Sequence, residues 1–117
     1  MSIIGRGYLI FLLITFSSCN RKFDKIKWRE YYDPGIPNPN RSKMLDDLIR
    51  NYKLVNIKYS QLIDLLGKPD HIESSEISYH IVVDYGKDID PIYTKNLDFS
   101  FKRDSIITSY KVTEWKK

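Results

Sequence analysis

Between residues 42 and 52, apolar side chains recur at steps of three and four residues, a period that predicts a helix with one buried face. We expect Ser42 to cap this helix. Asp46 and Asp47 follow early, near the end where the helix dipole favours acidic side chains. The apolar positions are Met44, Leu45, Leu48, Ile49 and Tyr52.

The same period predicts a second, shorter helix over residues 59–66. Its apolar stripe consists of Leu62, Leu65 and Leu66. Gly67 follows directly, and glycine readily adopts the left-handed backbone geometry that ends a helix. The next proline, Pro69, prevents any continuation.

Beyond Pro69 the period changes to two, which is typical of strands with one buried face. This alternation predicts strands over residues 77–85, 97–101 and 106–114. Residues 86–96 would join the first two strands as a long loop, and residues 103–105 would form a tight turn before the third.

The pattern does not decide which face of the third strand points inward, because apolar residues occupy both of its sides. Ile106, Tyr110 and Val112 lie on one side, whereas Ile107 and Trp115 lie on the other. The order of elements predicts an α+β fold, with two N-terminal helices packed on a three-stranded antiparallel β-meander.

The start of the chain has the order of a secretory signal peptide. Arg6 is followed by an apolar run to Phe16, two serines and the only cysteine, Cys19. Ile3 to Phe16 gives 14 residues, fewer than the about 20 that a membrane span requires. The cysteine in this position resembles the lipobox of bacterial lipoproteins. That resemblance implies cleavage after Ser18 and acylation of Cys19, with palmitate among the chains, while a plain secretory leader is the alternative.

These features divide the chain into a signal peptide (1–18), a lipidated cysteine with an extended tether (19–41) and a folded domain (42–117). The prediction of an extended tether is based on residues 33–40, which hold three prolines and one glycine. The aromatic tether residues would pack on the domain or form a strip for a partner. They are Trp28, Tyr31 and Tyr32.

Charge and composition narrow the possible functions. The formal net charge is +4, which is too small to argue for nucleic-acid binding. Basic residues gather directly behind Cys19, where they would touch anionic lipid headgroups or remain a solvated tether. A single cysteine also excludes an internal disulfide.

Residues 56–69 carry a motif that resembles the SmpA/OmlA (BamE-like) lipoprotein domain. Lys58 and Asn56 depart from that motif, which has threonine and glycine there. The resemblance implies a small outer-membrane lipoprotein that acts in envelope assembly by contacting other proteins. One matching residue, Gln61, can also bond back to the backbone amide of the residue that caps its helix. The matching residues are Gln61, Leu65, Leu66, Gly67 and Pro69.

No catalytic arrangement or cofactor motif is visible in the sequence. His71 and His80 lack partners at metal-ligand spacing. The aspartates around the predicted loop do not match a calcium-binding loop, so we interpret them as a solvated turn. They are Asp84, Asp88 and Asp90.

The sequence therefore predicts a lipid-anchored protein of the bacterial cell envelope, in the outer membrane, that serves as a non-catalytic protein-interaction module. We expect its partner to be another envelope protein. The predicted contact residues are Tyr85, Asp88, Asp90 and Tyr93. The alternative is a secreted inhibitor-like or ligand-binding domain with a tyrosine-lined sheet face. That face would use Tyr79, Tyr85, Tyr93 and Tyr110.

Overall fold

The computed structural model describes residues 21–30, 32, 36–87 and 89–117. In this part of the chain it has the expected α+β fold, but with three helices and four strands instead of two and three. The predicted signal peptide and Cys19 lie outside the described residues. The elements are α2 (Lys25–Trp28), α3 (Asn40–Asn51), α4 (Tyr59–Leu66), β1 (His71–Ile72), β2 (Glu76–Asp84), β3 (Tyr93–Phe101) and β4 (Ile107–Lys116).

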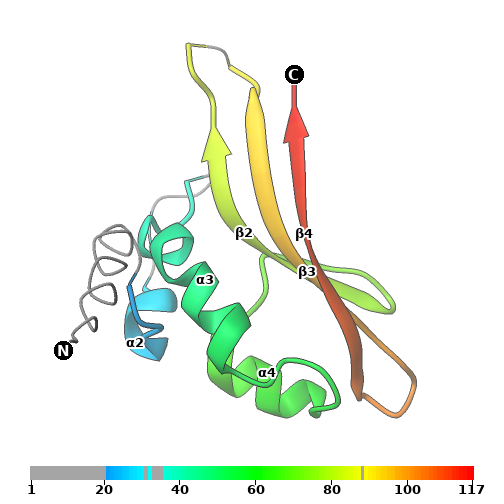
Figure 1. The fold of residues 1–117 in the computed structure, drawn as a ribbon. Coiled ribbons are helices and arrows are strands. Elements are labelled where there is room, and N and C mark those ends of the chain that lie inside the picture. The colour runs from blue at the N-terminus through cyan, green and yellow to red at the C-terminus, as the bar shows by residue number, and fades with distance from the viewer. Residues whose placement is uncertain (1–20, 31, 33–35, 88) are drawn as a thin grey trace, which may run out of the picture.

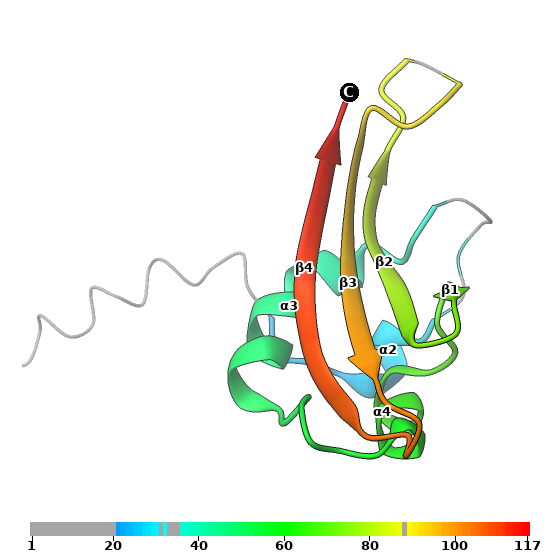
Figure 2. The same cartoon turned by 90° about the vertical axis from the view of Figure 1, so that its right-hand side faces the viewer.

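The four strands follow one another across the sheet in the order β1-β2-β3-β4, and each is antiparallel to its neighbour. The helices lie on one side of the sheet, with α2 outermost and packed on α3 and α4 (Figure 1). The other face of the sheet carries no described helix (Figure 2). The largest fully buried side chains are Trp28, Tyr79, Phe99, Met44 and Leu48.

Two strand predictions need correction. The sequence did not indicate β1, because two residues are too few to show a period. β3 begins at Tyr93, so residues 93–96 belong to a strand and not to the predicted loop. The helices cover only one end of the sheet, and the strands extend beyond them (Figure 1). The start of β3 therefore does not need the apolar alternation that a covered strand shows.

A β-bulge explains why the inward face of β4 was ambiguous. Phe101 pairs with Ile107 and Ser100 pairs with Ser109, so Thr108 is an extra residue in β4. The extra residue reverses the alternation of side chains. Ile107 can therefore be fully buried although Tyr110 also packs against the core.

The start of α3 differs from the prediction. The helix begins at Asn40, and the side-chain oxygen of Asn38 accepts the Asn40 amide proton at 2.8 Å. The predicted cap, Ser42, lies inside the helix and donates its hydroxyl to the Pro39 carbonyl. The first turn holds no acidic residue, so Asp46 and Asp47 are not placed by the helix dipole.

α4 has the local structure that the sequence indicated. The Gln61 side chain accepts the amide proton of Lys58, the N-cap residue, at 2.8 Å. Asn56 has a left-handed backbone, with φ of 63°, a geometry that asparagine tolerates. Gly67 ends the helix at φ of 81°, and a Cβ there would lie 2.9 Å from the Arg29 Nε atom. Of the three-leucine stripe, Leu62 and Leu66 are fully buried.

The segment predicted as an extended tether is part of the folded domain, at least in its described residues. Residues 21–30 lie along α3, and the Arg21 amide donates to the Lys43 carbonyl at 2.9 Å. Phe23 and Trp28 are buried in the core, and Trp28 belongs to α2. Burial of two large aromatic side chains offsets the entropy lost when this segment is ordered. The predicted boundary at residue 42 is therefore wrong.

Candidate functional site

Three of the four predicted contact residues are described, and they lie at the end of the sheet that the helices leave uncovered. Tyr85 and Asp90 belong to the connection between β2 and β3, where Tyr85 is half-buried and Asp90 is exposed. Tyr93 opens β3 opposite Asp84. The fourth predicted residue, Asp88, lies outside the described residues.

Tyr93 is held within the sheet by its neighbours on β4. Its hydroxyl donates to a carboxylate oxygen of Glu114, and this hydrogen bond raises the pKa of Tyr93. The Lys116 ammonium lies 6.0 Å from the centre of its ring. Tyr93 therefore helps to build the uncovered end of the sheet and is not a freely projecting aromatic anchor.

The tyrosine-lined face that the alternative function needs does not form. Tyr79 is fully buried under the helices, and its hydroxyl donates to the Gly67 carbonyl at 2.7 Å. Burial raises the pKa of Tyr79, so its hydroxyl stays protonated in the ordinary pH range. Tyr110 packs against Phe99 at the edge of the core. A ligand on this face cannot reach Tyr79.

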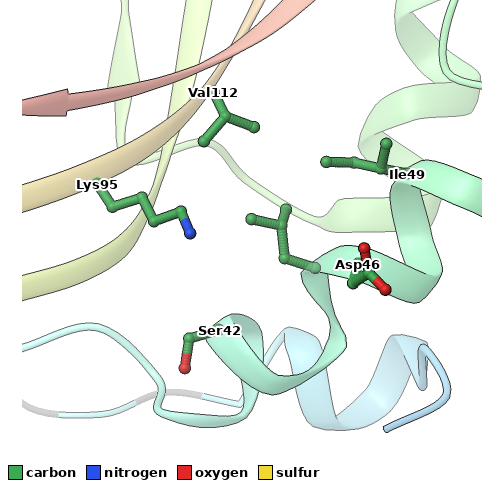
Figure 3. A pocket seen from close by; sticks show the side chains of 6 residues that line it. Ser42, Asp46, Ile49, Lys95 and Val112 are labelled. Carbon is green, nitrogen blue, oxygen red and sulfur yellow. The ribbon is translucent and has the colours of Figure 1, made fainter. Parts of the chain in front are cut away.

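A groove of about 490 Å³ opens between α3 and the sheet, on the side of β4 (Figure 3). Leu45 and Ile49 of α3 line the groove together with Val112 of β4, and these three side chains form its apolar part. Lys95 of β3 points into it from the sheet (Figure 3). Its remaining lining residues are Ser42 and Asp46.

The groove lies beside a free edge of the sheet. β4 is the last strand, and among the described residues its positions 109–116 pair only with β3. At its start, the same edge already binds another backbone segment of the chain. Ile107 donates to the Ile57 carbonyl at 2.8 Å and accepts from the Asn56 amide at 2.8 Å. The outward backbone groups of this edge strand are therefore available to pair with a further segment.

The uncovered sheet face is tied together by polar side chains. Asp98 is only 7% exposed, and its carboxylate accepts hydroxyl protons from Ser78 at 2.6 Å and Thr113 at 3.0 Å. These bonds link β2, β3 and β4 across the face that no described helix covers. They give Asp98 a structural role, because its two oxygens are occupied by neighbouring strands.

Sequence reasoning placed the contact surface on the loop and missed the groove. The apolar stripe of α3 contained the signal. Met44 and Leu48 are almost fully buried, whereas Ile49, on the same stripe, is only half-buried and lines the groove. The apolar stripe of α3 is therefore wider than the part of the sheet that covers it. That Ile49 lies near Val112 depends on strand pairing, which the helical period of the sequence does not reveal.

Chemically, the groove offers apolar contact flanked by one amine and one carboxylate. Asp46 is paired with Arg50 on the next turn of α3.

No group of three or more His, Cys, Asp or Glu side chains gathers at metal-binding distance within the described ranges. His71 contacts Glu73 at 3.2 Å, and the His80 amide donates to Asp70.

Comparisons with known proteins found no match for this chain among protein-family models, curated proteins or solved structures. None of the helices in the described residues is long and apolar enough to cross a membrane. The likeness of residues 56–69 to the BamE-like motif thus stays a prediction that those residues alone support.

Proposed function

We propose that this protein is a lipid-anchored protein of the bacterial cell envelope, located in the outer membrane, that acts as a non-catalytic interaction module. Cys19 is its acylated anchor, and another envelope protein is its partner. The anchor rests on the order of residues 6–19, and the BamE-like motif at residues 56–69 agrees with such a role.

The observation that carries the interaction role is the groove beside the free edge of β4, half of whose lining residues are apolar. An extended segment of a partner could add to this edge by backbone hydrogen bonds, the mode known as β-augmentation. Every second side chain of that segment would point to the helix side of the sheet. An apolar side chain there would meet Leu45, Ile49 and Val112.

This arrangement indicates which side chains the partner segment should carry. The segment should be extended, with alternating apolar residues, and one acidic residue could pair with the amine of Lys95. The charges along β4 limit pairing with unsuitable strands, because Lys111 and Lys116 lie on opposite faces of this edge strand.

Photo-crosslinking in a bacterial host tests the proposal. A photoreactive residue at Ser42, on the groove rim, should give an adduct of one defined mass with the full-length chain. Val112→Arg should reduce this adduct at least fivefold, because a charged side chain would occupy the apolar part of the groove. Ile72→Arg is the matched control, since Ile72 is an exposed isoleucine on β1, far along the sheet order.

Two results would contradict the proposal. One is the absence of any defined adduct from Ser42 when the chain is produced at its normal level. The other is an adduct that Val112→Arg and Ile72→Arg leave equally strong, because the partner would then lie outside the groove.

A further inference from the structure

The charge of the chain is concentrated in one short segment. Residues 21–30 contain five basic and two acidic side chains, and therefore supply most of the net charge of +4. The fold keeps this segment together, because it lies along α3 and forms α2. Lys43 of α3 adds another exposed cation beside Arg21, whose amide binds the Lys43 carbonyl.

An exposed apolar side chain lies between two of these cations in the sequence. Ile26 is 75% exposed, although its neighbour Trp28 is completely buried. Successive residues of a helix are turned by about 100°. Ile26 is turned by about 200° from Trp28, so it points away from the core, with Lys25 and Lys27 on either side of it.

Three acidic side chains in or near this segment are occupied within the fold. Asp24 accepts the amide protons of Ile26 and Lys27. Asp47 accepts the Phe23 amide proton at 2.7 Å, and Asp64 pairs with Lys25 at 3.3 Å. Both Lys25 and Asp64 are well exposed, so this pair holds Lys25 only weakly.

We infer that the α2 surface, consisting of Arg21, Lys22, Lys25, Ile26, Lys27 and Lys43, binds the surface of an anionic lipid bilayer. Cations around an exposed apolar side chain are the pattern of an interfacial membrane contact, in which the apolar group enters the bilayer and the cations bind headgroups. α2 is also the outermost layer on the helix side, so a flat bilayer can approach it (Figure 1).

The orientation of the α2 surface at the membrane rests on the proposed lipid anchor. Cys19 and Arg21 are two residues apart, a reach of about 7 Å at most. An acylated Cys19 would therefore hold the α2 surface at the headgroups, and a single acyl chain gains strongly from a neighbouring basic surface. The uncovered sheet face, on the other side of the molecule from α2, would then point away from the membrane.

Vesicle binding of residues 21–117 tests the surface without the anchor. Every core residue in the described part lies between Phe23 and Ile107, so this fragment contains the complete core. We expect it to bind vesicles of phosphatidylcholine with 30% phosphatidylglycerol, and not phosphatidylcholine alone. Binding should weaken as salt increases, because salt screens exposed charges. Lys22→Gln with Lys27→Gln should weaken it about twenty-fivefold, at about fivefold for each charge.

The matched control is Lys102→Gln with Arg103→Gln, which removes two exposed charges from the turn between β3 and β4. It should change binding less than twofold. As a second readout, an environment-sensitive dye on Ile26→Cys should report an apolar environment with anionic vesicles. The fragment contains no other cysteine. The same dye on Ser105→Cys should report water.

Equal binding to both kinds of vesicle, or equal loss in the two double variants, would overturn the inference. A dye at position 26 that remains in water would do the same. Acylation of Cys19 is measured on the full-length chain, so the two ideas can fail separately. Anionic binding by the fragment would support the α2 surface even if Cys19 carried no lipid.

Discussion

At the scale of single residues, Arg41 joins three separate parts of the fold through one guanidinium group. Its Nε donates to the Trp28 carbonyl at 3.1 Å, and its Nη1 donates to Asp70 at 2.9 Å and to the His80 carbonyl at 3.1 Å. The side chain is 10% exposed and lies over the rings of Trp28 and Tyr79. Arg41 thus ties α2 to α3 and to the sheet.

Arg41→Met should lower the free energy of unfolding by about 2 kcal/mol, because the Trp28 and His80 carbonyls each lose one hydrogen bond and Asp70 loses its charged partner. Asp70 adds less than a fully buried partner would, since it is about a third exposed. Urea unfolding, followed by tryptophan fluorescence, measures this change. Arg50→Met is the matched control, because Arg50 makes an exposed pair on the same helix and should contribute about 0.5 kcal/mol or less. Equal midpoints for the two variants would contradict the role of Arg41.

Some residues could be interpreted correctly from the sequence, and others could not. Gln61 and Gly67 act on backbone groups within a few residues, so local chemistry was sufficient to predict their roles. Arg41 looks like any polar residue near the start of a helix. Its burial depends on Trp28 and Asp70, which are distant in sequence and come together only in the fold.

At the scale of elements, the attachment of residues 21–24 to α3 depends on Asp47. The hydrogen bond from the Phe23 amide, together with one from the Asn51 side chain, lowers the pKa of Asp47 below its ordinary value of 3.8. A carboxyl with a lowered pKa in the folded state stabilises the fold above that ordinary value, and the contribution is lost as the pH falls through the lowered pKa.

We therefore expect the attachment of the N-terminal segment to weaken below about pH 4. Unfolding of the wild type and of Asp47→Asn, measured from pH 7 to pH 2.5, checks this. The variant should be less stable at pH 7, and the difference should shrink towards low pH. Asp90→Asn, which alters an exposed loop carboxylate, is the control. A difference that stays constant with pH would show that Asp47 acts by its shape alone.

Element boundaries were predicted well where neighbours in sequence determine them. α4 spans the predicted residues 59–66, since both its start and its end are encoded locally. α2 was missed because four residues cannot show a helical period, and prolines nearby favoured an extended chain. The start of β3 was missed because no helix covers it and its side chains are polar.

At the scale of the whole molecule, the proposals place two surfaces on different sides. The α2 surface would face the membrane, and the groove beside β4 would stay open to a partner. This arrangement would let one small domain hold a partner segment close to a bilayer. It follows from the attachment of residues 21–30 to α3, which leaves little free chain between Cys19 and the fold.

The anchor itself can be tested by intact mass. The full-length chain in a bacterial host should yield a membrane-bound product that begins at Cys19 and carries acyl chains. Cys19→Ala should remove the added mass and move the protein out of the membrane fraction, and Ser2→Ala is a control within the leader. A soluble, unmodified product cut near Ser18 would instead support a secreted domain.

The sequence by itself determined the fold class, the extent of α4 and the alternating core of β2, because these depend on local periods and caps. Only the tertiary structure decided that residues 21–30 belong to the domain, that Thr108 bulges, and that Ile49 and Val112 line one groove. The physical reason is the same in each case. Burial and strand pairing join residues far apart in the chain, and no local pattern records which distant partners will meet.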